Sequence, residues 1–299
     1  MSKIQKVTLL GKGTLGSAVL EQLLNAGFTV TVLSRTPDSV KGLPSGVKVD
    51  RVDYSSVESL ATALRGQDAV VSTVGPGALS SQKLTIEACI LAGVKRYIPS
   101  DYGAITTDPK AQTLPINRST VEIQQYLAEK ARSGDLEYTV LATGPFLDLL
   151  ISWPFAVDFQ NRSVELFDGG VHPFSTTRLA TIGKAIAGVL RNTEATKNRV
   201  VYVHDIVLTQ AKILALAKKY SAPGEKWTET VVDSQTELDK ALDGIAKGGL
   251  DQRKSMALIK AALFSGKYAT EYKSVDNELL GLGFLSEEEL DAMFAAKSS

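Results

Sequence analysis

The first half of the chain alternates between two patterns of hydrophobic and polar positions. Short apolar or β-branched runs, which are typical of strands, are separated by segments whose apolar residues recur at helical spacing. The predicted strands cover residues 7–10, 28–33, 47–52, 68–74, 94–98 and 136–142. The predicted helices between the later strands cover residues 55–64, 79–92 and 117–133. Six strands alternating with helices predict an α/β fold with a doubly wound parallel sheet of the Rossmann type.

The second half of the chain lacks this regular alternation. Aromatic and turn residues gather between residues 153 and 174. Helical spacing then returns at residues 179–190, 208–219, 237–246, 251–264 and 287–294. We therefore expect a Rossmann domain over residues 1–150 and a smaller, mainly helical substrate-binding domain over 151–299. A strand predicted near 199–204 would return to the first domain.

The first predicted strand ends in a glycine-rich turn, Gly11-Lys12-Gly13-Thr14-Leu15-Gly16, and a helical pattern follows it. The first glycine permits a sharp turn, the second lets a pyrophosphate approach the backbone, and the third lets the helix pack on the strand. Free N–H groups and the positive helix end attract an anion. The turn therefore predicts dinucleotide binding through these glycines, Thr14 and Leu15, against the alternative of a glycine-rich turn in an unrelated α/β domain.

The second predicted strand ends at Ser34-Arg35-Thr36. A site specific for NAD would carry a carboxylate here to bind the ribose 2′-hydroxyl. Arg35 instead offers a planar set of donors that suits a 2′-phosphate. We therefore predict that Ser34 and Arg35 favour NADP(H), with a solvated arginine at a strand end as the alternative.

Later strands of the predicted sheet also end in residues suited to cofactor contacts. Asp53 and Tyr54 follow the third strand, where the adenine of a bound dinucleotide would lie, although Asp53 could equally help to cap the next helix. The remaining candidates follow the fourth, fifth and sixth strands: Val74, Gly75, Pro76, Ser100, Asp101, Gly144, Pro145 and Phe146. All of them would lie at the carboxyl edge of the sheet, where such folds bind ligands.

Charge and composition narrow the class of protein. The 299 residues contain 33 Lys and Arg and 33 Asp and Glu, so no global basic field favours nucleic acid or an acidic membrane. The longest apolar runs are of strand size, which predicts a soluble, cytoplasmic protein. The single cysteine, Cys89, is expected to be a core thiol, and the two histidines lack the partners of a metal site. A small molecule is the expected partner, bound by a monomer or homodimer.

The stretch AGVKRYIPSDYG, residues 92–103, resembles the NmrA-like and isoflavone-reductase-like family, an atypical branch of the short-chain dehydrogenases. Further segments look like its fungal members: residues 121–127, 143–146, 224–227 and 276–282. The resemblance implies an NADPH-binding fold. In many members it also implies reduction of aromatic or enone-like small molecules.

One position departs from this family. Its reductases place a lysine immediately before the valine of the VEIQxYL pattern, and that lysine is the candidate for assisting proton transfer. Here the position is Thr120, which can form hydrogen bonds but has no titrating ammonium group. Arg118 could act as a fixed positive charge that stabilises an anion, or could be a solvated residue of the first helical turn. Thr120 and Arg118 are therefore the catalytic candidates on this helix.

His172 is a third catalytic candidate. It follows Gly169-Gly170 in a loop that the family places over the substrate, and imidazole can shuttle protons at neutral pH, although a hydrogen-bonded surface role is the alternative. Tyr126 and Lys130 match the Tyr-x-x-x-Lys pattern of ordinary short-chain dehydrogenases, but they lie too far along their predicted helix, so we expect them to serve in packing. The predicted substrate-binding residues are Tyr102, Phe146, Trp153, Phe155, His172 and Phe174.

These features predict an NADPH-dependent reductase of an aromatic, quinone or enone-like small molecule in secondary metabolism. The small-molecule partner would be an aromatic or polyketide-like substrate. Two other classes of function stay open. One is a redox-silent NADP(H)-binding regulator of the NmrA type. The other is a redox-neutral isomerase, cyclase or dehydratase in which Asp101, Tyr102 or His172 handles protons.

Overall fold

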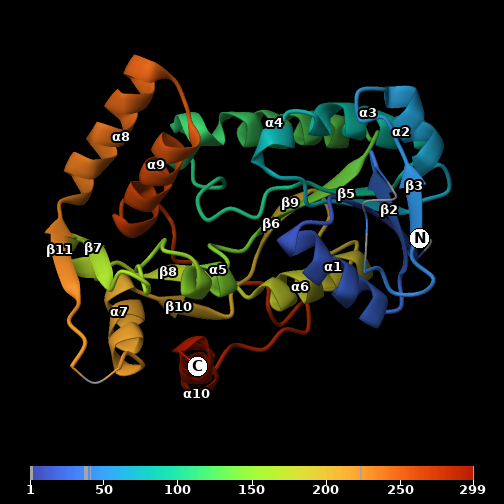
Figure 1. Ribbon diagram of the computed structural model, residues 1–299. Helices are drawn as coiled ribbons and strands as arrows, with labels where there is room; N and C mark the ends of the chain where they lie inside the picture. The colour runs from blue at the N-terminus through green and yellow to red at the C-terminus, as the bar shows by residue number, and fades with distance from the viewer. Residues whose placement is uncertain (1–2, 37–39, 41, 223, 299) are drawn as a thin grey trace.

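A seven-stranded parallel sheet organises the computed structural model, which describes residues 3–36, 40, 42–222 and 224–298 (Figure 1). Its strand order is β3-β2-β1-β4-β5-β6-β9. The strands are β1 Lys6–Leu10, β2 Thr29–Ser34, β3 Lys48–Arg51, β4 Ala69–Ser72, β5 Arg96–Ile98, β6 Glu137–Ala142 and β9 Arg199–Tyr202. The six strands predicted from the apolar runs of the first half are therefore confirmed, together with the doubly wound parallel topology.

Helices cover both faces of this sheet. On one face lie α1 (Thr14–Asn25) and α6 (Leu179–Arg191), and on the other lie α2 (Val57–Leu64), α3 (Gln82–Ala92) and α4 (Arg118–Arg132) (Figure 1). Successive residues of a strand point to opposite faces, so Leu9 joins the core beneath α1 and α6 whereas Leu10 joins the core beneath α2 and α3. Because both faces are covered, the inner strands β1, β2 and β4 are buried along nearly their whole length and are largely apolar or β-branched.

The second half of the chain contains short strands that the sequence pattern did not predict. Strand β7 (Ser163–Phe167) pairs in parallel with β11 (Thr228–Val232), and β8 (Phe174–Thr176) pairs antiparallel with β10 (Ile206–Leu208). The helices of this half are α5 Leu147–Ser152, α7 Gln210–Lys219, α8 Ser234–Gly248, α9 Gln252–Phe264 and α10 Glu287–Ser298. These strands lie in the half of the chain that lacks the regular alternation of apolar runs and helical segments, so no flanking pattern identifies them.

Phe264, the last residue of α9, is the centre of the core of this second half. Its ring centroid lies 5.7 Å from that of Phe155, 5.9 Å from that of Phe167 and 5.3 Å from that of Phe174. The tilted rings are in the range at which aromatic pairs stabilise one another beyond simple burial. The aromatic residues that cluster in the sequence therefore form a packed core.

Residues 179–202 return to the sheet although they follow residue 150 in the sequence. Strand β9 pairs in parallel with β6, from Thr139 opposite Arg199 to Ala142 opposite Tyr202, and α6 packs against α1. Asp276 then covers the free edge of β9, because its backbone N–H donates to the Tyr202 carbonyl oxygen at 2.7 Å and its carboxylate accepts from the Tyr202 N–H at 2.9 Å. The segment that contains Asp276 thus covers the edge of the sheet at β9.

Within the part of the chain that the structure describes, no helix has both the length and the apolar character needed to cross a bilayer. Cys89 is buried in α3, and burial raises the pKa of its thiol.

Candidate cofactor and substrate site

The glycine-rich turn between β1 and α1 has the shape that a bound dinucleotide requires. Gly11 has a φ of +86°, and a Cβ atom there would lie 2.8 Å from the Thr73 carbonyl oxygen. A Cβ atom on Gly16 would lie 2.0 Å from the Gly11 carbonyl oxygen, so the start of α1 packs directly on the turn. At Gly13, by contrast, no described atom lies within 4 Å of the added carbon. The turn is therefore closed behind Gly11 and Gly16 and open at Gly13.

The backbone N–H groups at the N-terminus of α1 are available to bind an anion. Gly13 is the N-cap and provides no side-chain hydrogen bond, and the first turn, which begins with Thr14 and Leu15, contains no acidic residue. Thr73, which the sequence analysis missed, holds the turn in place: its hydroxyl donates to the carbonyl oxygens of Gly11 at 2.6 Å and Leu10 at 3.0 Å. Backbone N–H groups at such a helix start bind phosphate oxygens.

The end of β2 brings a cationic side chain to the same edge. Ser34 lies at the end of the strand, where its hydroxyl accepts from the Thr36 N–H at 3.1 Å, and Arg35 is exposed. Leu10 of β1 is paired with Leu33 of β2, so the glycine-rich turn and Arg35 follow neighbouring strands at the carboxyl edge.

Asp53 and Tyr54 make contacts within the protein near the end of β3. The Asp53 carboxylate accepts from the Ser55 N–H at 2.8 Å and the Ser55 hydroxyl at 2.6 Å, and these bonds lower its pKa. Ser56, rather than Asp53, caps α2 by accepting from the Ser59 N–H. The Tyr54 hydroxyl donates to the Leu33 carbonyl oxygen at 3.0 Å, and burial raises its pKa to about 12 although Arg35 opposes this.

The turns after β4 and β5 are tied to each other. The Ser100 hydroxyl donates to the Val74 carbonyl oxygen at 2.7 Å, and its N–H donates to the Gln82 side chain at 2.7 Å. Gly75 and Pro76 are exposed at the start of a short 3₁₀ turn. These contacts fix the backbone that would line the middle of a bound cofactor.

Asp101 is a buried carboxyl that holds the loop after β5. It accepts from the Thr106 hydroxyl at 2.7 Å and from the Gln124 amide at 2.5 Å, and burial raises its pKa despite these hydrogen bonds. Tyr102 is also buried, and its hydroxyl donates to the Ser72 carbonyl oxygen at 3.0 Å. Both side chains are thus engaged inside the protein, and Asp101 joins the loop of residues 104–114 to α4 through Thr106 and Gln124.

The turn after β6 contacts Tyr272, a residue that no local sequence pattern indicated. Gly144 has a φ of +66°, and a Cβ atom there would lie 2.0 Å from the Ser175 carbonyl oxygen of β8. Its N–H donates to the Tyr272 hydroxyl at 3.1 Å, and that hydroxyl donates in turn to the Ala104 carbonyl oxygen at 3.1 Å. Pro145 and Phe146 are half-buried beyond Gly144. Tyr272 therefore joins three segments that are distant in the sequence.

The structure separates the two catalytic candidates on α4. Thr120 is only 7% exposed, and Gln124, one turn later on the same face, contacts Asp101, so this face lies against the carboxyl end of β5. The Arg118 side chain is 83% exposed, and its Nε lies 3.0 Å from a carboxylate oxygen of Glu122. Thr120 therefore lies beside the carboxyl edge of the sheet, whereas Arg118 points to solvent. Tyr126, further along α4, lies beneath the ammonium group of Lys130, with 5.0 Å between the nitrogen and the ring centroid.

His172 lies within the second half of the chain. Its Nε2 atom is 3.3 Å from an Asp168 carboxylate oxygen, and its ring packs on Gly266, where a Cβ atom would lie 2.4 Å from Nδ1. Burial acts to raise the pKa of Asp168, but hydrogen bonds from Ser234 and His172 outweigh it and lower that pKa. His172 and Asp168 form a half-exposed pair between η5 (Asp168–Gly170) and the end of α9.

The structure does not bring all the predicted substrate residues together. Phe174 is fully buried against Phe264 and has no surface that a substrate could contact, which corrects its assignment to the substrate wall. Trp153 is 55% exposed, and Phe155 is half-buried against Phe264. Phe146 lies at the carboxyl edge of the sheet, next to the end of β6.

No metal centre is formed by the residues that the structure describes, because nowhere do three or more His, Cys, Asp or Glu side chains converge in a way that could hold an ion.

Comparisons with known proteins agree with this geometry. A family model described as NAD(P)H-binding matches residues 11–149, from the glycine-rich turn to α5. The chain is 32% identical over 294 residues to the oxidoreductase aprR of Aspergillus flavus, covering 96% of this chain and 97% of that one. It is 29% identical over 157 residues to an isoflavone reductase-like protein of Olea europaea, covering 49% and 50% of the two chains.

Among solved structures, the fold is similar to that of leucoanthocyanidin reductase from Vitis vinifera in its binary complex with NADPH. The TM-score is 0.75 at 18% sequence identity, over 98% of this chain and 99% of the other.

Proposed function

The chain belongs to the isoflavone reductase-like family of NAD(P)H-binding oxidoreductases, and from this membership we propose that it is an NADPH-dependent reductase of an aromatic, quinone or enone-like small molecule. The cofactor supplies hydride when bound. The protein supplies the turn that holds the cofactor, the arginine that selects it and the surface on which the substrate lies.

The observation that carries the proposal is the contrast between Gly13 and its two neighbouring glycines. Gly11 and Gly16 are packed so closely that a side chain at either would collide with the backbone, whereas Gly13 faces open space next to the uncapped start of α1. A pyrophosphate needs this close approach to backbone N–H groups. The residues present therefore fit the diphosphate of a dinucleotide.

Preference for NADPH over NADH is supported by the charges at the end of β2. Arg35 is exposed there, and no carboxylate occupies Ser34-Arg35-Thr36. A guanidinium group suits a 2′-phosphate, and a carboxylate that would repel it is missing from this segment.

The substrate class follows from the side chains that surround the carboxyl edge. Thr120 faces this edge but cannot supply a proton at neutral pH, and Arg118 faces solvent. Reduction of a quinone adds one hydride and one proton, and the hydroquinone anion is stable enough to take its proton from water. Quinone-like acceptors therefore suit this site better than substrates that need an acid within the protein. Phe146 offers an aromatic wall near the same edge.

The test measures NADPH absorbance while the purified protein meets a panel of quinones, enones and aromatic ketones, after titration has established that NADPH binds. Consumption of NADPH with equimolar formation of reduced product supports the proposal. The Gly13→Ala variant is the matched control, because it should fold normally and consume far less. Firm NADPH binding without consumption across the panel would overturn the reductase assignment.

A second candidate function is a redox-silent NADP(H)-binding regulator. It is favoured by one observation: neither group at the start of α4 is an available proton donor, since Thr120 carries only a hydroxyl and Arg118 pairs with Glu122 in solvent. In that case NADPH would bind with normal affinity and be recovered unchanged. A redox-neutral enzyme on the same fold would instead yield a product of unchanged oxidation state.

A further inference from the structure

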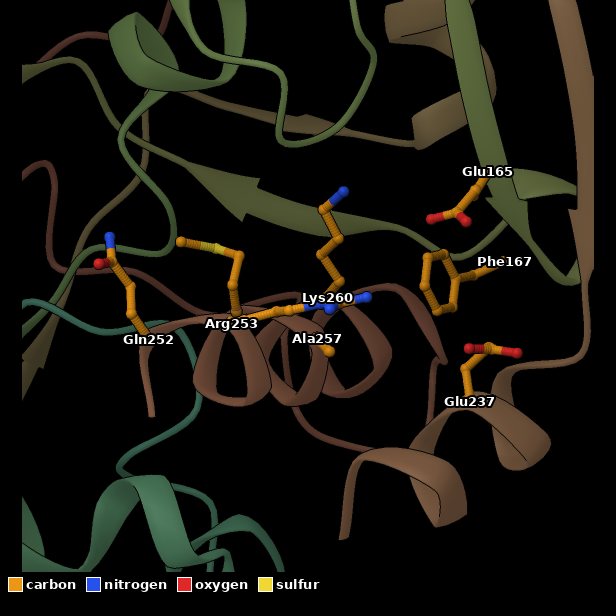
Figure 2. A pocket seen from close by; sticks show the side chains of 8 residues that line it. Glu165, Phe167, Glu237, Gln252, Arg253, Ala257 and Lys260 are labelled. Atoms are coloured by element: carbon orange, nitrogen blue, oxygen red, sulfur yellow. The ribbon is translucent and has the colours of Figure 1, made fainter. Parts of the chain in front are cut away.

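A cavity of about 570 Å³ lies in the second half of the chain, between β7, α8 and α9 (Figure 2). Its lining residues come only from these three elements: Glu165, Phe167, Glu237, Gln252, Arg253, Met256, Ala257 and Lys260. No residue of the glycine-rich turn or of the carboxyl edge of the sheet is among them. The cavity is therefore distinct from the cofactor site, and its volume is in the range that holds small organic ligands.

The floor of this cavity is aromatic and rigid. Phe167 is 4% exposed, and its ring centroid lies 5.9 Å from that of Phe264. Its backbone N–H donates to the Gln210 side chain at 3.1 Å, which fixes the end of β7. Met256 adds a polarizable thioether from α9. Aromatic rings pack well against such a surface, because sulfur and ring edges both contribute favourable contacts.

The rim of the cavity carries charges that have no counterpart in the protein. Within residues 3–36, 40, 42–222 and 224–298, the side chains of Glu165 and Arg253 take part in no hydrogen bond or ion pair. The Lys260 ammonium lies 5.8 Å from the centroid of Phe155, and its charge also helps to lower the pKa of the Asp158 carboxyl. Glu237 differs from Glu165 and Arg253, since it forms an ion pair with Lys240 at 2.7 Å. One acidic and one basic group, Glu165 and Arg253, are thus free to meet a ligand, and Lys260 adds a second positive charge beside them.

These charges come from different elements around the cavity. Figure 2 shows Glu165 and Glu237 on either side of the Phe167 ring, while Arg253 and Lys260 project from α9. A ligand in the cavity would therefore meet an acidic side chain from β7 and basic side chains from α9, with the apolar surface of Phe167 beside them. A guanidinium group binds a carboxylate through two parallel hydrogen bonds, and a carboxylate in turn binds an ammonium group.

We propose that this cavity is a binding site for an aromatic α-amino acid, or for a compound with the same zwitterionic aromatic chemistry. The ring of the ligand packs on Phe167 and Met256. Its carboxylate binds Arg253, with Lys260 adding a second positive charge, and its ammonium group binds Glu165. The site requires neither a bound dinucleotide nor the proposed reductase activity.

The experiment uses the full chain and three probes that share one ring: L-phenylalanine, 3-phenylpropanoate and 2-phenylethylamine. Calorimetric titration of the wild-type protein should show L-phenylalanine binding at least about tenfold more tightly than either of the others, because each lacks one of the two charged groups. Absence of L-phenylalanine binding, or equal binding of all three probes, would overturn the proposal.

Two surface variants separate the charges. Arg253→Ala should weaken L-phenylalanine and 3-phenylpropanoate by about tenfold and leave 2-phenylethylamine unchanged. Glu165→Gln should weaken L-phenylalanine and 2-phenylethylamine and leave 3-phenylpropanoate unchanged. Lys247→Ala, an exposed cation of α8 outside the cavity, is the control and should alter none of them. Unchanged L-phenylalanine affinity in Arg253→Ala and Glu165→Gln would contradict the assignment.

A separate NADPH titration of each variant keeps this proposal distinct from the proposed function. Both variants should bind NADPH as the wild-type protein does, because neither residue lies at the glycine-rich turn. Loss of L-phenylalanine binding with intact NADPH binding supports the second site. Loss of L-phenylalanine binding and NADPH binding together would show that these residues act on the fold, and would overturn the proposed second site.

Discussion

Gly16 lies directly against Gly11, so that a Cβ atom on Gly16 would come within 2.0 Å of the Gly11 carbonyl oxygen and 2.7 Å of the Thr73 hydroxyl oxygen. We predict that Gly16→Ala displaces α1 from the turn. Overpacking of this kind costs about 1–3 kcal/mol of folding free energy. Urea unfolding should show the loss of stability, and titration should show NADPH affinity reduced by at least about tenfold. Wild-type stability and affinity in this variant would contradict the packing described.

Gly13→Ala separates cofactor binding from folding. No described atom lies within 4 Å of the added methyl group, and the φ of −85° at this position suits alanine. The variant should therefore keep nearly the thermal midpoint of the wild-type protein, apart from about 1 kcal/mol for a poorer N-cap. NADPH affinity should fall, because the methyl group occupies the space next to the uncapped helix start. Unimpaired NADPH binding would place the pyrophosphate elsewhere.

Arg35→Ala tests the choice of nicotinamide cofactor. Arg35 is exposed at the end of β2, so its removal should leave the fold intact. A charged hydrogen bond to a phosphate contributes about 1.5–3 kcal/mol, which corresponds to at least about a tenfold loss of NADPH affinity. Affinity for NADH should change little. Parallel titrations of both cofactors measure this, and equal weakening of the two would refute a 2′-phosphate contact.

Arg118→Ala is predicted to have little effect. The side chain is 83% exposed and pairs with Glu122 four residues later on the same helix, and such surface pairs contribute about 0.5 kcal/mol or less. Turnover with the best acceptor of the panel should stay within about twofold of wild type, since a solvated cation adds little to transition-state stabilisation. A drop of about a hundredfold would instead mean that Arg118 turns into the site during the reaction.

His204 should make the stability of the protein depend on pH. Burial lowers its pKa below the ordinary value, although Asp205 and Glu271 oppose this, and its Nδ1 atom lies 2.9 Å from the Ser175 hydroxyl oxygen. The unfolded chain therefore binds a proton more readily than the folded protein. The stabilisation is complete above about pH 6.5 and is lost as the pH falls below that value.

Urea midpoints at about pH 5.5 and about pH 7.5, on either side of the ordinary histidine pKa, check this prediction. His204→Gln should reduce the difference between the two midpoints. The chain has only 2 histidines, so His172→Gln is the matched control. It should retain the part of the difference between the two urea midpoints that depends on His204. An unaltered difference in His204→Gln would exclude His204 as its source.

Local patterns were sufficient to predict the parallel sheet and its glycine-rich turn. The strands β1, β2 and β4 are buried on both faces, so their sequences are largely apolar or β-branched, and the glycine-rich turn follows β1 immediately. The helix α4 was predicted within one residue at each end for the same reason. Interactions between neighbours in the sequence decide these features.

Other features depend on contacts between distant segments. Tyr272 reaches Gly144 across 128 residues, and no local pattern indicates that contact. Arg118 and Thr120 differ by two positions, yet one faces solvent and the other faces the sheet, because the orientation of α4 is set by the packing of its apolar face. The aromatic residues near 153–174 resembled a substrate wall, but Phe174 fills the core around Phe264.

The sequence by itself therefore determined the order of strands and helices in the first half of the chain, the place of the glycine-rich turn and the absence of a carboxylate at Ser34-Arg35-Thr36, because each is a property of neighbouring residues. Only the tertiary structure decided that Tyr272 reaches Gly144, that Asp101 is buried beneath its loop, and that Glu165 and Arg253 meet at one cavity. Such contacts join residues whose separation along the chain carries no periodic signal, so they arise from the packing of whole elements.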